Sequence, residues 1–459
     1  MDKAPERIYF VGGGGIGMAA LERYFLSQGK DVAAYDRTPS DLTRRLADEG
    51  VAMCYDDDAA TAIPQQFRSK EGTLVVYTPA VPADSALMRY FREGGFHMVK
   101  RAEALGVITR GSRALCFAGT HGKTTTSSMA AHVLHHCPCG CNAFLGGILR
   151  NYDSNLLLAP DSDWTVVEAD EYDRSFHHLR PHIAVITATD PDHLDIYGTE
   201  EAYLESFAHF TELIRPGGSL VVHTGLKLHP RAGRDVSVFT YSRHEGDFHA
   251  DNIRVADGTI TFDFVHPGGR IADIELGVPV QINIDNAVAA LAACWLTGDL
   301  TPDAARIAMA SYMGSERRFQ FLLKQPDGGR VIIDDYAHHP DELRTSIASV
   351  RALYPGRRLT VAFQPHLYTR TRDFAPQFAD ALSGADSVVL TDIYPARELP
   401  LPGVSSEIIL RDVRCDDKTL IAKDNLVDWL KNCNFDILLA CGAGDMSLLL
   451  PQVAESYKA

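Results

Sequence analysis

The segment from residue 118 to residue 127, Ala-Gly-Thr-His-Gly-Lys-Thr-Thr-Thr-Ser, constrains the fold of this chain more than any other. It follows the apolar run 114–117 and precedes a helix-like stretch, so a strand, a glycine loop and a helix N-terminus occur in that order. Backbone N–H groups and the positive end of the helix dipole bind phosphate at such a loop. The segment therefore predicts a strand–loop–helix unit that holds a nucleotide phosphate.

The side chains of this loop suit that interpretation. We expect Lys123 to reach the terminal phosphates and a hydroxyl of Thr124 or Thr125 to ligate Mg2+. The common phosphate-loop pattern has another glycine before the Gly-Lys pair, so this loop is a shorter variant anchored by Gly119 and Gly122. The alternative, an ordinary strand-to-helix turn, is disfavoured because Gly-Lys-Thr directly between a strand and a helix is a specific arrangement.

The length of 459 residues suggests three domains, at about 150 residues each. The net charge of −16 argues against nucleic-acid or anionic-membrane partners. No apolar run approaches the roughly 20 residues that cross a bilayer. Strand-like sequence begins by Ile8, which leaves no room for a signal peptide, so we expect a cytoplasmic protein.

The nine cysteines are scattered and odd in number, which favours reduced thiols over a disulfide framework. Cys137, Cys139 and Cys141 alternate with Pro138 and Gly140. Because this spacing departs from the Cys-x-x-Cys pairs of zinc sites, we expect a tight loop there and no structural zinc.

Strand and helix patterns alternate in three stretches, which predicts an α/β fold with parallel sheets. We expect an N-terminal Rossmann-like domain over 1–111, a central P-loop ATPase-like domain over 112–313 and a C-terminal Rossmann-like domain over 314–459. The expected strands are 8–11, 32–35, 74–77, 164–167, 183–187, 219–222, 331–334, 359–363, 388–390 and 437–440, with a strand-like region over 246–278 and helices over 286–296 and 303–312.

A second glycine loop lies near the N-terminus. Gly12, Gly14 and Gly17 form Gly-x-Gly-x-x-Gly directly after a strand, and Asp36 ends the next strand. The glycines admit a pyrophosphate and the acid meets a ribose hydroxyl in dinucleotide-binding proteins. A UDP-sugar also carries a diphosphate. The pattern therefore predicts a bound diphosphate but does not distinguish a dinucleotide from a UDP-sugar. The alternative is a purely structural turn.

Acidic side chains follow two strands of the predicted central sheet. The run Glu-Ala-Asp-Glu-Tyr-Asp occupies 168–173, and Thr-Asp-Pro-Asp-His-Leu-Asp occupies 189–195. Because parallel strands open on one edge of a sheet, both runs are expected there, where phosphate-loop proteins hold Mg2+. His193 is a candidate ligand for a second Mg2+ or for a phosphate. The alternatives are a solvated acidic turn and a structural histidine.

Polar residues also follow two strands of the third domain, at 334–340 and 363–372. Arg370 and Arg372 are candidates to bind a carboxylate, because the guanidinium fork matches its two oxygens. Salt bridges within a loop are the alternative.

Together these motifs resemble the Mur ligase superfamily over nearly the whole chain. The resemblance is carried by Gly-Thr-His-Gly-Lys-Thr-Thr-Thr at 119–126, Glu-Ala-Asp-Glu at 168–171, Asp-His at 192–193, Asn-x-x-Asn at 283–286, Arg-Arg-Phe at 317–319, Asp-Tyr-Ala-His-His-Pro at 335–340 and Phe-Gln-Pro-His-Leu-Tyr-Thr-Arg at 363–370. It implies ATP-dependent ligation of L-alanine to the lactyl carboxylate of UDP-N-acetylmuramate, with ATP and Mg2+ as cofactors, in peptidoglycan synthesis and cell wall biogenesis.

The resemblance also implies a role for each matching residue. The catalytic set is Lys123, Glu171, His193, Arg317 and Asp335. The implied metal ligands are Thr124, Thr125, Glu171 and His193. ATP is expected to contact Gly119, Thr120, His121, Gly122, Lys123, Thr124, Thr125, Asn283, Asn286, Arg317 and Asp335. The UDP-substrate set is Gly12, Gly13, Gly14, Gly15, Ile16, Gly17, Asp36 and Thr78, and the amino-acid set is His338, His366, Arg370 and Arg372.

The chain departs from the family pattern at three places. Gly13 replaces an expected isoleucine, and the turn 77–80, Tyr-Thr-Pro-Ala, replaces Ser-Ser-Ala-Ile. Other branches place a carbamylated lysine where residues 206–210 have none, which is consistent with the alanine-adding branch.

The implied chemistry passes through an acyl phosphate. A base must then deprotonate the amine of L-alanine, and His338, His339 and His366 are candidates. Acyl phosphates hydrolyse readily, so we expect the C-terminal domain to close on the central one and exclude water.

Three alternatives remain at this point. A sister ligase attaches a recycled tripeptide to the same UDP-sugar, although the compact segment 173–181 favours single alanine. A dinucleotide-dependent oxidoreductase with an ATPase domain would bind NAD, and a nucleotide-binding regulator would release no phosphate. The sequence does not choose between a monomer and a homodimer.

Overall fold

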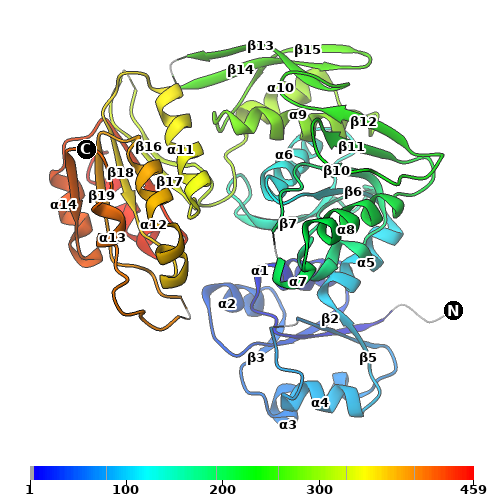
Figure 1. Ribbon diagram of the computed structural model, residues 1–459. Helices are drawn as coiled ribbons and strands as arrows, with labels where there is room; N and C mark the ends of the chain where they lie inside the picture. Colours follow the sequence, from blue (N-terminus) through cyan, green and yellow to red (C-terminus); the bar gives the residue numbers. More distant parts are fainter. Residues whose placement is uncertain are drawn as a thin grey trace. The chain divides into compact units, whose positions relative to one another are not determined.

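The computed structural model describes residues 5–78, 80–192, 194–256, 258–326, 328–396 and 398–458, and these contain three large sheets flanked by helices (Figure 1). The five- and seven-stranded sheets belong to one compact unit, and the six-stranded sheet belongs to a second. Within the described ranges, no helix is both long and apolar enough to span a bilayer. The predicted α/β class is confirmed.

The N-terminal sheet is parallel, in the order β3-β2-β1-β4-β5. The glycine loop follows β1, the central strand, as expected for a Rossmann-like domain. The three expected strands are confirmed, whereas β3 and β5 are short and partly exposed and give little apolar signal. The elements are β1 (Arg7–Val11), α1 (Ile16–Ser27), β2 (Asp31–Tyr35), α2 (Asp41–Asp48), β3 (Ala52–Cys54), α3 (Ala59–Ala62), β4 (Thr73–Tyr77), α4 (Ala86–Glu93), β5 (His97–Lys100) and α5 (Arg101–Gly111).

The central sheet has the order β12-β11-β10-β6-β9-β7-β8, in which the β7–β8 pair is antiparallel and the other five pairs are parallel. The strand before the phosphate loop, β6, lies between β10 and β9, with Ala118 opposite Ile186 and Phe117 opposite Glu168. The loops after these three strands therefore emerge at one edge. The elements are β6 (Arg113–Ala118), α6 (Lys123–His135), β7 (Asn142–Leu149), β8 (Ser154–Leu157), β9 (Trp164–Glu168), β10 (Pro181–Ile186), α7 (Leu194–Tyr197), α8 (Glu200–Glu212), β11 (Ser219–His223) and β12 (Ser237–Tyr241).

The helix after the phosphate loop, α6, is buried from Thr126 to Leu134. A second helix, α9 (Ile282–Trp295), packs against it, and the Cys294 thiol lies 3.6 Å from the Ala130 carbonyl oxygen. Residues 287–294 of α9 are buried, and this stretch of the helix is apolar on every face. This helix begins four residues earlier than the expected 286–296, and α10 (Pro302–Ser311) follows it.

The N-terminal and central sheets share one apolar core. A single cluster of buried side chains runs from Ile8 and Val32 in the first sheet to Cys116 and Ala184 in the second. At the same joint, the Asn155 amide donates a 2.6 Å hydrogen bond to the Ile16 carbonyl oxygen. The two glycine loops are therefore carried by one packed body.

The C-terminal sheet has the order β16-β17-β21-β18-β19-β20. The last strand of the chain, β21, is inserted between β17 and β18, and β16 is an antiparallel edge strand. The elements are β16 (Gln320–Lys324), β17 (Val331–Asp335), α11 (Pro340–Leu353), β18 (Leu359–Phe363), α12 (Tyr368–Leu382), β19 (Ser387–Leu390), α13 (Glu407–Leu410), β20 (Asp417–Leu420), α14 (Leu426–Asn432), β21 (Ile437–Cys441) and α15 (Leu450–Glu455). The strand-like region 246–278 forms a small sheet of β13 (His249–Ala256), β14 (Thr259–His266) and β15 (Gly269–Glu275).

Candidate active site

The phosphate loop needs glycine at both of its predicted anchors. Gly119 has φ of 141° and Gly122 has φ of 82°, values that residues with a side chain rarely adopt. A Cβ on Gly119 would overlap the Thr187 hydroxyl oxygen and lie 2.8 Å from the Ala188 nitrogen. A Cβ on Gly122 would lie 2.8 Å from the Asn286 amide oxygen. The loop is therefore closely enclosed by the neighbouring strand end and by α9.

Hydrogen bonds fix the loop to the segment that follows β10. The Thr120 N–H donates to the Ala188 carbonyl oxygen at 3.1 Å, and the Thr120 hydroxyl donates to the Asp190 carbonyl oxygen at 2.7 Å. The Thr187 hydroxyl donates to the carbonyl oxygen of His121. The second predicted strand end is thus joined to the loop through two backbone carbonyl oxygens and the Thr187 hydroxyl.

The N-terminus of α6 is open to an anion. Its N-cap residue is Gly122, and no side chain caps the first turn, whereas α4 and α8 are capped by Ser85 and Thr199. The first-turn N–H groups of a helix have no partner within the helix. They remain available to phosphate oxygens, next to the partly exposed Thr124 and Thr125.

The predicted catalytic lysine lies in the first turn of α6 and contacts the predicted metal ligand. The Lys123 ammonium lies 2.8 Å and 2.7 Å from the two carboxylate oxygens of Glu171, and it donates to the Gly119 carbonyl oxygen at 2.7 Å. The Glu171 side chain is only 1% exposed. Burial raises the pKa of Glu171, and the nearby Lys123 ammonium opposes that rise. The structure thus brings Lys123 and Glu171 together as an ion pair.

The other acids after β9 point elsewhere. Asp170 lies 3.8 Å from the guanidinium of Arg101, and Asp173 lies 3.3 Å from the ammonium of Lys100. Tyr197 fixes the backbone of Glu171, because the Tyr197 hydroxyl donates a 2.5 Å hydrogen bond to the Glu171 carbonyl oxygen. Of this acidic run, Glu171 is the residue aimed at the phosphate loop.

The proposed second-metal ligand, His193, lies outside the described residues. Among the residues that are described, no group of three or more His, Cys, Asp or Glu side chains has the geometry to hold a metal ion. The predicted metal ligands Thr124, Thr125, Glu171 and His193 therefore stay a prediction.

The N-terminal loop is also built around glycine. Gly12 has φ of 89°, and a Cβ on it would overlap the Thr78 side chain, so the loop and the predicted Thr78 lie together. The N–H groups of Gly12 and Gly13 each donate to the Tyr35 carbonyl oxygen at 2.8 Å. Gly15 caps α1 without a side-chain hydrogen bond, so this helix N-terminus is open as well.

The Asp36 side chain stabilises this loop by accepting hydrogen bonds from backbone N–H groups. One carboxylate oxygen accepts a 2.6 Å hydrogen bond from the Gly14 N–H, and the other accepts from the Thr38 N–H at 3.0 Å. The structure therefore gives Asp36 a role in shaping the loop, in addition to its predicted contact with the nucleotide.

Sequence reasoning missed Arg101, at the start of α5. A Cβ on Gly17 would overlap an Nη atom of Arg101, so this guanidinium covers the first turn of α1. A basic residue directly after the strand β5 is the signal that points to it. The positive charge of Arg101 therefore lies beside the N-terminal glycine loop, where it would attract a bound anion.

Arg317 and Asp335 form hydrogen bonds to other residues of the C-terminal domain. The Arg317 guanidinium donates to the carbonyl oxygens of Gly442 and Gly444 at 2.6 and 3.0 Å. The Asp335 carboxylate accepts from the Phe319 N–H at 3.1 Å and from the Ser346 hydroxyl. Their predicted contacts with ATP remain predictions, as does that of Asn283, whose amide donates to Val278 O at 3.0 Å.

Two of the three candidate bases lie together. The rings of His338 and His366 are 6.0 Å apart, and burial lowers the pKa of both. Neutral imidazole is the form that accepts a proton. His339 instead caps α11, where its ring nitrogen accepts from the Asp341 N–H at 3.4 Å.

Arg370 and Arg372 do not converge on one ligand. Both lie on α12, and side chains two residues apart point to different faces of a helix. Arg372 is exposed and pairs with Asp373 at 2.7 Å, as the salt-bridge alternative predicts. Arg370 remains the arginine near the histidine pair, because its charge lowers the pKa of His338 and of His366.

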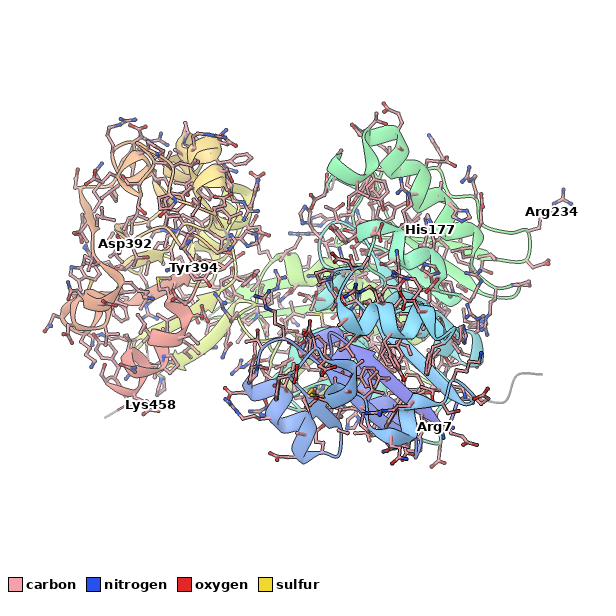
Figure 2. All side chains as sticks on the ribbon, turned by 90° about the horizontal axis from the view of Figure 1, so that it is seen from below. Arg7, His177, Arg234, Asp392, Tyr394 and Lys458 are labelled. Atoms are coloured by element: carbon pink, nitrogen blue, oxygen red, sulfur yellow. The ribbon has the colours of Figure 1, made fainter. Side chains whose placement is uncertain are left out.

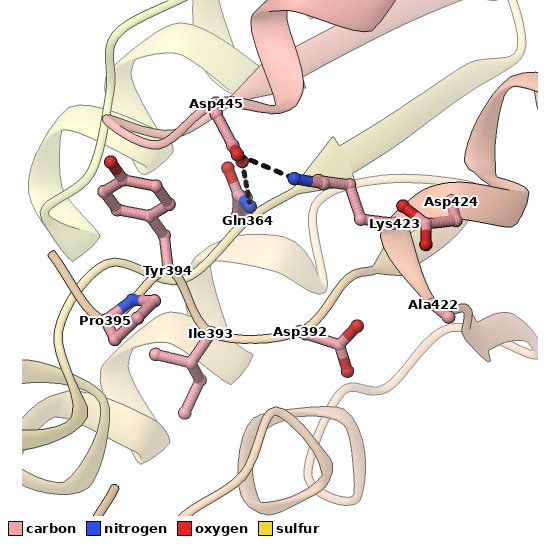
Figure 3. Close-up of a pocket in the computed structure, with 9 residues that line it drawn as sticks. All are labelled: Gln364, Asp392, Ile393, Tyr394, Pro395, Ala422, Lys423, Asp424 and Asp445. Atoms are coloured by element: carbon pink, nitrogen blue, oxygen red, sulfur yellow. Dashed lines mark hydrogen bonds and ion pairs between the residues drawn. The ribbon is translucent and has the colours of Figure 1, made fainter. Parts of the chain in front are cut away.

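A cavity of about 290 Å³ opens at the carboxyl edge of this sheet (Figure 3). Asp445 lines it and accepts from the Gln364 amide at 3.1 Å, and it pairs with Lys423 at 2.6 Å. Asp392 and Tyr394 line it as well and are labelled in Figure 2. The Tyr394 ring stacks on His366 at 5.7 Å, which places the cavity beside the histidine pair. The run Gly-Ala-Gly-Asp after a strand, at 442–445, is the signal that sequence reasoning missed.

The cysteine-rich segment forms the expected tight loop. The Gly140 N–H donates to the Cys137 carbonyl oxygen at 3.1 Å, and Gly140 has φ of 56°. Each of the nine cysteines is free in the structure.

Family models cover most of the chain. The model described as Mur ligase family, catalytic domain, matches residues 7–113, the Mur ligase middle domain matches 117–294, and the Mur ligase, glutamate ligase domain, matches 317–446. These matches run in the order of the three predicted domains, whose exact boundaries stay a prediction.

Individual relatives match over nearly their full length. The UDP-N-acetylmuramate–L-alanine ligase of Parabacteroides distasonis is 57% identical over 98% of this chain and 96% of its own. The ligase of the same name from Phocaeicola vulgatus is 54% identical over 98% and 97%. The solved structure of UDP-N-acetylmuramate-alanine ligase from Thermotoga maritima has a TM-score of 0.79 and 26% identity, and covers 98% of this chain and 99% of that one.

We predict that Gly119→Ala weakens ATP binding at least about tenfold, because the new Cβ overlaps Thr187 and the backbone is strained. Titration calorimetry with ATP measures the effect. Gly111→Ala is the matched control, since nothing lies within 4 Å of its Cβ position and we expect wild-type affinity. Equal affinity of the Gly119 variant and the control would contradict the enclosed loop.

Proposed function

The chain belongs to the Mur ligase family, and we propose that it forms the amide between L-alanine and the lactyl carboxylate of UDP-N-acetylmuramate in an ATP-dependent reaction in the cytoplasm. One observation carries the proposal beyond the relatives' names. The Lys123–Glu171 pair lies in the same packed unit as a second, open glycine loop, so one body offers sites for a triphosphate and for a diphosphate.

In the first step, a carboxylate oxygen of the muramic acid attacks the γ-phosphorus of ATP in line and ADP leaves. The product is an acyl phosphate. Negative charge spreads over the transferring phosphoryl group, and Lys123 together with the open N-terminus of α6 stabilises it electrostatically. Lys123 must leave Glu171 partly or wholly to do so, since the ion pair holds its ammonium at 2.7 Å.

Carboxylate and hydroxyl oxygens are the protein ligands that Mg2+ prefers. Glu171 is a buried carboxylate beside the phosphate loop, and Thr124 and Thr125 lie in the first turn of α6, so these residues suit the ion. When bound, Mg2+ neutralises phosphate charge and fixes the phosphate oxygens. Once Lys123 turns to phosphate, Glu171 is left as a buried carboxylate, and a cation ligand compensates it.

In the second step, the amine of L-alanine attacks the acyl carbon, and phosphate leaves from the tetrahedral intermediate. The attacking amine must be uncharged, so a base has to take its proton. His338 and His366 are our candidates, because burial lowers the pKa of both and keeps them neutral at pH 7. We assign the carboxylate of the amino acid to Arg370, whose charge reaches both rings.

The proposal is tested by phosphate release from ATP in the presence of UDP-N-acetylmuramate. We expect release to depend on L-alanine and to accompany a UDP-linked product heavier by one alanine residue. Release that depends on a tripeptide instead would support the recycling ligase. Binding of NAD without UDP-sugar binding would support the oxidoreductase, and binding without any release would support a regulator.

We predict that Lys123→Ala reduces phosphoryl transfer at least about a thousandfold, because it removes the cation that stabilises the transferring group. Affinity for UDP-N-acetylmuramate should stay within twofold of wild type, since its loop lies on the other sheet. Lys227→Ala, which removes an exposed lysine paired with Glu200, is the control. An equal loss of UDP-substrate affinity in the Lys123 variant would argue against separate sites.

We predict that Glu171→Gln raises the Mg2+ concentration needed for half-maximal activity about tenfold, because an amide is a weaker ligand than a carboxylate. The measurement is a Mg2+ titration of phosphate release at saturating ATP. Glu212→Gln, on the surface of α8, should leave the titration unchanged. An unshifted midpoint in the Glu171 variant would remove this residue from the metal site.

A further inference from the structure

A buried carboxyl lies beneath the N-terminal glycine loop. Glu22, on the inner face of α1, has 0% exposure. Neither of its carboxyl oxygens has a hydrogen-bond partner among the described residues. Burying a polar group without a partner costs free energy, so this residue opposes the stability of the fold. The chemistry proposed above does not use it directly.

The Glu22 carboxyl fills the space behind Gly13. A Cβ on Gly13 would overlap one carboxyl oxygen of Glu22 and would lie 2.8 Å from the Cβ of Ala34. Gly13 is also one of the two residues whose N–H groups bond to the Tyr35 carbonyl oxygen. The carboxyl therefore packs directly against the backbone of the loop, between α1 and β2.

Burial and two neighbouring acids oppose the ionised form of Glu22. Burial raises the pKa of the Glu22 carboxyl well above its usual range, and Asp36 and Glu49 raise it further, while Arg23 lowers it. Arg23 is itself paired with Glu49 at 2.6 Å, so its charge is largely compensated. Asp36, at the end of β2, braces the same loop through the Gly14 N–H. Burial therefore favours the uncharged form of the Glu22 carboxyl.

We propose that Glu22 is a positioning residue for the diphosphate of the UDP-sugar, whose uncharged carboxyl supports Gly13 and keeps the loop open to the anion. The shape of the side chain holds the loop backbone in place. Its neutrality matters equally, because a carboxylate behind the loop would repel a diphosphate on the other side in a low-dielectric environment. This inference rests on the proposed function, since the loop is taken to bind that diphosphate.

Binding of UDP-N-acetylmuramate to Glu22 variants of the full-length protein tests the inference. We expect Glu22→Ala to weaken binding about tenfold and Glu22→Gln, which keeps shape and neutrality, to stay within twofold of wild type. ATP affinity should not change in either. The control is Glu93→Gln, an exposed glutamate at the end of α4 that does not act on Glu22, with wild-type binding expected. Wild-type affinity in Glu22→Ala would overturn the inference, whereas no binding by the wild type would overturn the proposed function.

The pH dependence separates positioning from simple packing. If rising pH ionises Glu22, UDP-substrate binding by the wild type should weaken with it, while Glu22→Gln should lose less affinity. Identical profiles for the two proteins would overturn the inference. The wild-type minus Glu22→Gln infrared spectrum should show the carbonyl band of a protonated carboxylic acid at neutral pH, and a carboxylate band instead would equally overturn it.

Thermal stability gives a readout without substrate. A carboxyl whose pKa is raised by folding adds stability below its unfolded pKa and loses that contribution as the pH rises toward the folded value. Glu22→Gln should therefore melt a few degrees above the wild type near pH 8, and this gap should shrink near pH 5. A gap that does not change with pH would show that Glu22 is not protonated by folding.

Discussion

The parallel placement of β6 between β9 and β10 is the constraint on which the rest of the central domain depends. It brings the loop after β6, the acid after β9 and the segment after β10 to one edge of the sheet. Lys123 and Glu171 meet there as a close ion pair, although they are far apart in the sequence. The loop could not approach Thr187 and Ala188 so closely without glycine at 119. The proposed catalytic cation and the candidate metal ligand therefore meet because of the strand order.

The two glycine loops use the same physical device in two settings. In each, a glycine caps a helix without a side-chain hydrogen bond, so the first-turn N–H groups are left for an anion. The two sheets share one apolar core, which holds both helix N-termini in a single body. The loops differ in what lies behind them. The phosphate loop has the amide of Asn286 against Gly122, and the N-terminal loop has the carboxyl of Glu22 against Gly13.

Much of this could be predicted from the sequence, because the features involved are local. Glycine at a positive φ, an apolar strand before a loop and acids after a strand each leave a signal in a few residues, and the predicted strands and Lys123–Glu171 site followed from them. The insertion of β21 between β17 and β18, the burial of Glu22 and the position of Arg101 depend on contacts between distant segments. Arg370 and Arg372 read as a pair in a loop, but the start of α12 at Tyr368 separates their faces.

In the proposed reaction, phosphoryl transfer at the Lys123 site activates the lactyl carboxylate before the amine attacks. The most direct test uses UDP-N-acetylmuramate labelled with 18O in that carboxylate, with ATP, Mg2+ and L-alanine. If the carboxylate oxygen attacks the γ-phosphorus, the phosphate released on amide formation carries one 18O atom from the substrate. Amide formation with unlabelled phosphate would contradict the account.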